Sequence, residues 1–255
     1  MSNNAYLKAM GIDVWIERNP TTPDIVNVEA VLPATEKAEA TDVSSFKTSI
    51  SASPELKENN KPEDITTTNI EVLDWQALRL HVAECKLCDL SKTRVQTIFG
   101  SGDQTASLMI IGNAPTIEDE KSGDAFSGEA GKLLTAMLKA MGYQRDNVYI
   151  SNIVKCKTTE NQEPSEEQAI SCEPYLLRQI SLLQPKLILA LGNAAAQRIL
   201  KSKSTMSRLR GQLHYVDGIN APILVSYHPT YLLAAPNEKR KAWEDLQIAM
   251  KELKL

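Results

Sequence analysis

Short apolar runs alternate with longer segments of helical periodicity after residue 70, and this alternation limits the folds that are open to the chain. The apolar runs have the length of buried strands and lie at 107–112, 147–153, 186–192, 213–216 and 221–227. Apolar residues recur with helical spacing in the segments 73–84, 128–141, 165–183, 193–201 and 236–253. Strands that alternate with helices in this way predict a mainly parallel sheet with helices on both faces. The predicted fold class is therefore α/β, with three layers in the order α/β/α.

The ends of the predicted strands indicate where a ligand would bind. In an open parallel sheet, ligands lie beyond the carboxyl ends of the strands. Three segments follow strands at such positions: GNAPT at 112–116, NIVKC at 152–156 and YHPTYLL at 227–233. We expect these three segments to converge on one site.

The first 70 residues differ in composition from the rest of the chain. Residues 20–70 are rich in Thr, Ser, Pro, Glu and Asn and have no sustained period, which predicts a disordered linker. Residues 1–19 contain a cluster of apolar side chains: Tyr6, Leu7, Met10, Ile12, Val14, Trp15 and Ile16. Such a cluster on a tether is typical of a partner-docking segment, here with Met10, Ile12 and Trp15 as contacts. The alternative is that it packs on its own domain, which we place at 71–255.

The distribution of charge bears on partners and on location. The net charge of −4 comes from the first 70 residues, where 11 acidic residues outnumber 6 basic ones. A local basic patch suffices to bind nucleic acid, and the candidate DNA-binding patch is Lys201, Lys203, Arg208 and Arg210. The alternative for these four residues is a solvated loop. No apolar run approaches the roughly 18 residues of a membrane helix, and the N-terminus lacks a secretory signal, so we expect a cytoplasmic, nucleoid-associated protein.

Four cysteines form two pairs, with none left over. Cys85 and Cys88 make a C-x2-C pair, and Cys156 and Cys172 are separated by fifteen residues. Four thiolates suit one tetrahedral metal centre, either zinc or a 4Fe–4S cluster. Two disulfides or four unconnected core cysteines are the alternatives. The C-x2-C spacing and a reducing compartment favour the metal.

Four blocks of sequence, taken together, identify a family. They are ECKLCDLSKTR at 84–94, GNAPTIEDEKSGDAFSGEAGKLL at 112–134, SNIVKCKTTENQEPSEEQAISCEPYL at 151–176 and HPTYLL at 228–233. These blocks resemble, in order, the signature blocks of the iron–sulfur (family 4) uracil-DNA glycosylases, and the match runs from about residue 73 to 253. The resemblance implies the uracil-DNA glycosylase fold and excision of uracil from DNA in base excision repair. It also implies a 4Fe–4S cluster held by the four cysteines.

The residues at the strand ends suit that reaction. The enzyme must flip the base out of the stack, hold it and stabilise the departing uracil anion. Phe126 supplies a flat face for stacking, the Asn152 amide fits the O4/N3 edge of uracil, and His228 can donate a hydrogen bond to O2. The structural alternatives are core packing for Phe126, a turn for Asn152 and a structural role for His228.

The first block also departs from the family pattern G-E-A-P-G. Ala114 and Pro115 remain and would form the pocket wall, but Asn113 replaces the glutamate and Thr116 the second glycine. Asn113 can orient a water but cannot act as a base at neutral pH. A side chain at Thr116 is expected to narrow a turn that glycine keeps open. Both changes weigh against strong catalysis.

The N-terminal segment LKAMGIDVWIERNP, at 7–20, has a resemblance of its own. It is similar to the start of the bacterial DNA polymerase III psi subunit, whose first segment docks on the clamp loader. Two hypotheses follow. The first is a uracil-DNA glycosylase tethered to the replication machinery. The second is a psi-like clamp-loader accessory subunit with a weak or inactive glycosylase-like domain.

Overall fold

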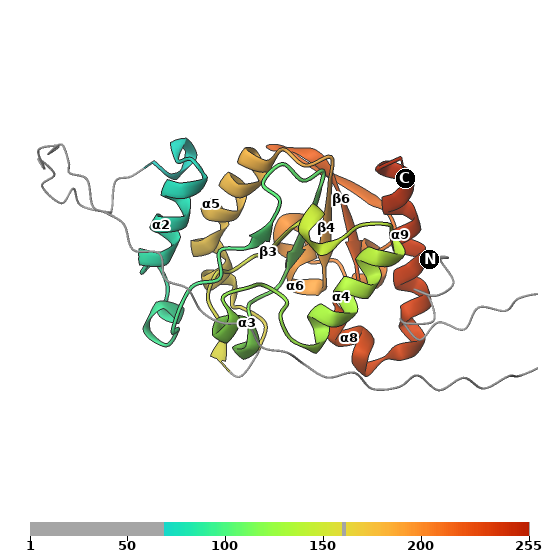
Figure 1. The fold of residues 1–255 in the computed structure, drawn as a ribbon, viewed down its shortest axis with the longest axis horizontal. Coiled ribbons are helices and arrows are strands. Elements are labelled where there is room, and N and C mark those ends of the chain that lie inside the picture. The colour runs from blue at the N-terminus through green and yellow to red at the C-terminus, as the bar shows by residue number, and fades with distance from the viewer. Residues whose placement is uncertain (1–68, 160–161, 255) are drawn as a thin grey trace, which may run out of the picture. The chain divides into compact units, whose positions relative to one another are not determined.

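The computed structural model describes residues 69–159 and 162–254 (Figure 1). The predicted docking segment 1–19 lies outside the described residues, as does the predicted linker except for its last two positions. The described chain begins at Asn69, whose side chain caps a short 3-10 helix, η2 (Ile70–Val72).

A six-stranded sheet forms the middle of the domain. Its strands are β1 (Ser101–Gly102), β2 (Leu108–Gly112), β3 (Tyr149–Asn152), β4 (Leu187–Leu191), β5 (Leu213–Val216) and β6 (Ile219–Ser226). They lie in the order β1-β3-β2-β4-β6-β5. The four inner strands are parallel, and the two edge strands β1 and β5 pair antiparallel with their neighbours. The mainly parallel sheet is the arrangement that the sequence predicts.

Helices cover both faces of this sheet. One face packs against α2 (Trp75–Glu84), α5 (Glu166–Leu183), α6 (Asn193–Ile199) and α7 (Met206–Leu209). The other packs against α4 (Glu129–Ala140), α8 (Pro229–Ala234) and α9 (Lys239–Glu252). Figure 1 shows α2 and α5 on one side of the strands and α4, α8 and α9 on the other. The predicted three-layer α/β fold is confirmed.

Alternation along the strands builds two separate apolar cores. In β2, Met109 and Ile111 face the α5 layer, whereas Leu108 and Ile110 face the α4 layer. Successive side chains point to opposite faces of a strand, so continuous apolar runs are required where both faces are covered. None of the helices in the described residues is both long enough and apolar enough to cross a membrane.

Several short elements are absent from the sequence prediction. They are α3 (Ile117–Ser122), α7, α8, the two-residue strand β1 and the 3-10 helices η2, η3 (Asp89–Lys92), η4 (Arg145–Asn147) and η6 (Pro236–Glu238). Each is too short to show a full helical or strand period in the sequence. Two of them, α3 and α8, begin directly beside the candidate site.

Candidate functional site

The ends of the inner strands meet at the point in the sheet where the order of strand addition reverses. The chain passes from β2 to β3 on one side, and then crosses to β4 on the other side of β2. The carboxyl ends of β2 and β4 therefore flank a topological switch point, where open α/β sheets bind ligands. A Cβ built on Gly192, at the end of β4, would lie 3.1 Å from His228 Cβ and 3.2 Å from both side-chain polar atoms of Asn113. The first and third predicted segments thus converge as expected.

Asn152 carries an amide with no partner in the protein. It ends β3, is 1% exposed and pairs in register with Gly112 of β2. Neither Oδ1 nor Nδ2 makes a hydrogen bond. A buried polar group without a partner costs free energy, so this amide is suited to a ligand that supplies both a donor and an acceptor. A Cβ on Gly112 would lie 2.5 Å from Asn152 Oδ1 and from Phe126 Cζ, so glycine is needed there.

His228 is a neutral hydrogen-bond donor. It is the N-cap of α8, and its Nδ1 accepts a hydrogen bond from the backbone N–H of Thr230 at 3.2 Å. Because Nδ1 accepts, the ring proton of the neutral imidazole is on Nε2. Burial lowers the pKa of His228 from 6.5 to about 4, and Asp119 offsets this only in part. At neutral pH the ring therefore offers one N–H and no positive charge.

Phe126 stacks beside His228, with ring centroids 5.3 Å apart and 30° between the planes. Its backbone has φ 56°, a left-handed conformation that is unfavourable for a side chain with a Cβ. The next residue, Ser127, is held by Asp119, whose Oδ1 accepts from the Ser127 backbone N–H at 2.6 Å and from its Oγ at 2.8 Å. Asp119 is 2% exposed. These bonds hold the strained loop in place and so fix the ring of Phe126.

Thr116 does not narrow the turn, contrary to the sequence expectation. Its φ is −91°, so no glycine is required. Its side chain instead caps α3 by accepting from the backbone N–H of Asp119, and Asp119 accepts from the Thr116 backbone N–H in return. This reciprocal pair is a capping box. Ala114 packs against the α5-side core and Pro115 is buried, as a wall for the site would be.

Asn113 is oriented by α6. Its Oδ1 accepts the backbone N–H of Ala195 at 2.9 Å, in the first turn of that helix. This bond fixes the orientation of the amide, which keeps a second lone pair on Oδ1 and the Nδ2 donor. Because an amide is not a base at neutral pH, Asn113 cannot take a proton from an attacking water.

The four cysteines line one cavity between α2, η3, the loop after β3 and α5. Cys85 and Cys88 flank α2 and η3, Cys156 is in the loop, and Cys172 is on α5. All four are free, so the disulfide alternative is not realised. Burial raises the pKa of the Cys88, Cys156 and Cys172 thiols, that of Cys172 to about 12. A metal centre that binds thiolates would displace these protons.

Within the described ranges, no three His, Cys, Asp or Glu side chains come close enough to hold a single metal ion. The four cysteines nevertheless line a single cavity.

Two cations adjoin the cysteines. Arg94 donates from Nη1 to Cys156 Sγ at 3.2 Å and from Nη2 to the carbonyl of Cys85 at 2.7 Å. Lys155 is 1% exposed, and burial lowers its pKa to about 8. Neither residue is a candidate in the sequence prediction, because nothing in the one-dimensional pattern shows that they approach the thiols.

The predicted DNA-binding patch divides in the structure. Lys203 and Arg208 are exposed, whereas Arg210 is turned inward to Asp245, with Nη2–Oδ1 at 2.6 Å and a side chain only 16% exposed. Lys201 lies 3.8 Å from Glu173, which also pairs with Arg198. The role of this patch in DNA binding stays a prediction.

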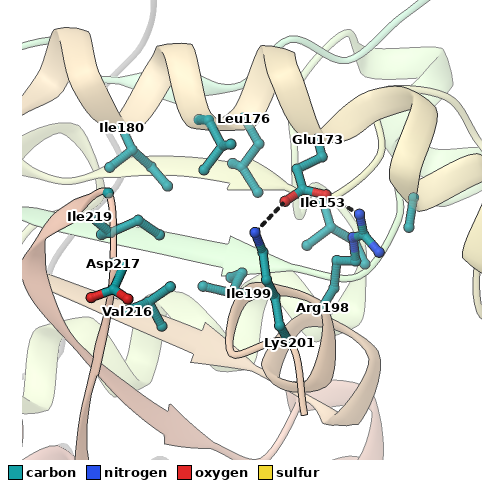
Figure 2. A pocket seen from close by; sticks show the side chains of 13 residues that line it. Ile153, Glu173, Leu176, Ile180, Arg198, Ile199, Lys201, Val216, Asp217 and Ile219 are labelled. Atoms are coloured by element: carbon teal, nitrogen blue, oxygen red, sulfur yellow. Dashed lines mark hydrogen bonds and ion pairs between the residues drawn. The ribbon is translucent and has the colours of Figure 1, made fainter. Parts of the chain in front are cut away.

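A second, apolar pocket lies behind the site, between α5, α6 and the β5–β6 turn. Figure 2 shows Leu176, Ile180 and Ile219 around it, with the ion pairs of Glu173 with Lys201 and Arg198 at one end. Its two carboxylates, Glu173 and Asp217, are not among the residues at the strand ends. The predicted partner contacts Met10, Ile12 and Trp15 lie outside the described residues.

Sequence reasoning missed four residues that shape the site: Gly112, Asp119, Lys155 and Gly192. The T-x-x-D spacing of Thr116 and Asp119 is a readable capping signal. The close approaches at Gly112 and Gly192 depend on strand register, which the sequence does not show.

The chain is similar to known uracil-DNA glycosylases. A family model described as the uracil DNA glycosylase superfamily matches residues 99–247. The chain is 35% identical over 179 residues to a type-4 uracil-DNA glycosylase of Sulfurisphaera tokodaii, covering 68% of this chain and 81% of that protein. It is 34% identical over 172 residues to one of Archaeoglobus fulgidus, covering 65% and 86%. It is 33% identical over 177 residues to one of Thermotoga maritima, covering 68% and 91%.

Proposed function

The chain belongs to the uracil-DNA glycosylase superfamily, and on that premise we propose that it excises uracil from DNA by hydrolysing the N-glycosidic bond. The observation that carries this proposal is the amide of Asn152, which is buried and unpartnered at a strand end beside Phe126 and His228. Uracil presents a carbonyl acceptor and an N–H donor on one edge, which complements an amide.

Each residue has a role that follows from its geometry. Phe126 stacks on the flipped base, and Asn152 reads its O4/N3 edge. The Nε2–H of His228 donates to O2, where negative charge develops as the bond to the sugar breaks. A neutral donor suits this task because it stabilises the leaving anion without giving up its proton. No covalent nucleophile is needed, since water attacks the sugar as the base departs.

An excision assay on a uracil-containing single-stranded oligonucleotide tests this function. Wild type should release uracil, and His228→Ala should lower the rate by about 10²- to 10³-fold, the usual cost of one such donor. Asn152→Asp should also lose activity, because a carboxylate cannot donate to O4. Equal background rates for wild type and both variants on every uracil substrate would refute the proposal.

We also propose that Cys85, Cys88, Cys156 and Cys172 hold a 4Fe–4S cluster. The family resemblance and the single cavity shared by the four cysteines support this. The cluster would supply a rigid link between α2 and α5 rather than chemistry at the base.

Protein purified without oxygen should be brown and contain about four irons per chain. Zinc, or no metal, would overturn the cluster, and Cys85→Ala should lose metal and stability together.

A replication tether is a separate proposal, which rests on the sequence of residues 7–20 alone. By its resemblance to the psi subunit, this segment would bind the clamp loader and bring the glycosylase to newly made DNA at the nucleoid.

The second candidate function is a psi-like accessory subunit whose glycosylase domain is weak. Asn113 favours it, because an amide cannot take a proton from the attacking water.

A further inference from the structure

Lys155 makes three hydrogen bonds from one buried nitrogen. Its Nζ donates to Ser151 Oγ at 2.6 Å, to the backbone carbonyl of Asn152 at 2.9 Å and to Gln179 Oε1 at 2.6 Å. Gln179 is itself fully buried, and its Nε2 donates to the carbonyl of Phe99 at 2.8 Å. The ammonium group therefore holds the end of β3 by hydrogen bonds to Ser151 and Asn152, and the Asn152 side chain is the one that would bind the base.

All three acceptors are neutral. A buried ammonium normally requires a negative partner, since burial of an unpaired charge is costly. Lys155 and the four cysteines line one cavity. As thiolates, Cys172 and Cys156 favour the charged form of Lys155.

We infer that Lys155 is a positioning residue through which occupancy of the cysteine centre sets the orientation of Asn152. The inference rests on the proposed uracil excision and adds a link between two sites to it. Four thiolates exceed the positive charge of zinc or of an oxidised cubane, so an occupied centre is negative. That charge holds the Lys155 ammonium in place, and the ammonium holds the Asn152 carbonyl.

Loss of the centre has a defined consequence in this arrangement. The ammonium would then be buried among neutral acceptors alone, and Lys155 would leave its three partners for solvent. The backbone carbonyl of Asn152, at the end of β3, would lose its hydrogen bond from Lys155. The unpartnered amide of Asn152 would then no longer meet the edge of the base at a fixed angle. Metal content and affinity for uracil should therefore change together, through Lys155.

The test measures inhibition by free uracil and metal content in the full-length chain. Free uracil is the probe because it reports on Asn152 directly, without the contacts of DNA. Lys155→Met removes charge and donors at similar length, and Lys155→Arg keeps the charge but cannot make three bonds from one nitrogen. The inhibition constant for uracil, determined on the metal-loaded fraction of each protein, should rise about 10-fold or more in both variants. This is the usual range for a residue that supports a ligand.

Two controls separate positioning from general damage. Arg94→Met removes the other cation from the centre but makes no contact with Asn152, so it should lower metal content and leave uracil inhibition per loaded molecule unchanged. Leu108→Ala cuts a fully buried side chain on the α4 side of the sheet, which lowers stability without touching either site.

The outcomes are distinct. Unchanged uracil inhibition per loaded molecule in Lys155→Met and Lys155→Arg would overturn the inference, as would an equal rise in Leu108→Ala. If Lys155→Met does not fold, Lys155→Arg decides alone. A wild type that excises no uracil refutes the proposed function instead, whereas an active wild type with unaffected variants refutes only the role of Lys155.

Discussion

At the scale of single residues, the site depends on which hydrogen-bonding atoms are already in use. His228 has its Nδ1 occupied by Thr230, and Asn113 has its Oδ1 occupied by Ala195. The ring of His228 therefore presents a donor and the amide of Asn113 is held in one orientation, whereas Asn152 presents both a donor and an acceptor that have no partner in the protein. The site as a whole is better equipped to bind and stabilise an anion than to activate water.

Asn113→Asp should accelerate uracil excision. One carboxylate oxygen would still accept from Ala195, where a negative charge at a helix N-terminus is favourable. The other would replace the Nδ2 donor with an acceptor for the attacking water, and general bases are usually worth about 10²-fold or more. Single-turnover excision measures this, with Asn113→Ala as the control that lacks both groups. A rate for Asn113→Asp no higher than wild type would contradict it.

The burial of His228 makes a prediction about pH and stability. The ordinary pKa of histidine is 6.5, and burial lowers that of His228 to about 4. Between these two values the unfolded chain binds a proton that the folded chain does not, so the free energy of unfolding falls as the pH is lowered through this window. Urea unfolding at several pH values should show a smaller fall for His228→Gln than for wild type. Identical pH profiles would show that burial does not lower this pKa.

At the scale of secondary-structure elements, the site is held by contacts between the sheet and its flanking helices. The end of β6, which leads into His228, is fixed to α9 by Asp245. Its carboxylate accepts from Ser226 Oγ at 2.7 Å and from Arg210. The guanidinium of Arg210 also lies over the ring of Tyr227. The buried ion pair thus joins β6, α9 and the segment after α7 just before His228.

Asp245→Ala should destabilise the protein by about 3 kcal/mol, because it leaves Arg210 largely buried without its main partner. Glu244→Ala is a matched control, since Glu244 lies 3.9 Å from the same guanidinium but is half exposed. Surface pairs of that kind contribute about 1 kcal/mol at most. Chemical denaturation measures the free energy of unfolding of both variants. Equal decreases would show that the buried pair contributes no more to stability than the exposed one.

At the scale of the whole molecule, the question is whether residues 1–19 act independently of the glycosylase. The predicted linker of about 50 residues would have an end-to-end distance of about 40 Å if flexible. That distance lets a docking segment bind one partner while the folded domain acts on DNA nearby.

Deletion of residues 1–19 should abolish capture by purified clamp loader and leave excision and iron content unchanged. Trp15→Ala should weaken capture by about 2 kcal/mol or more, since large aromatic residues commonly dominate such contacts. A pull-down, an excision assay and an iron determination on the same preparations measure these effects. Undiminished capture of the truncated chain would place the partner surface on the folded domain.

The sequence alone determined the fold class and the order of the main elements. Continuous apolar runs such as 186–192 have to be buried on both faces, and the helical spacing of segments such as 165–183 supplies the cover. It also predicted Asn152 and His228 as site residues, because they lie at the ends of predicted strands within blocks that resemble the family's signatures. The family itself followed from the signature blocks and is confirmed by comparison.

Only the tertiary structure decided what each of these residues can do. The orientation of the Asn113 amide depends on Ala195 of α6, 82 residues away in the chain, and the place of Lys155 between the cysteines and Asn152 depends on α5. The burial that keeps His228 neutral and the inward turn of Arg210 likewise come from elements distant in sequence. Hydrogen-bond partners and local dielectric arise from three-dimensional neighbours, which a one-dimensional pattern does not contain.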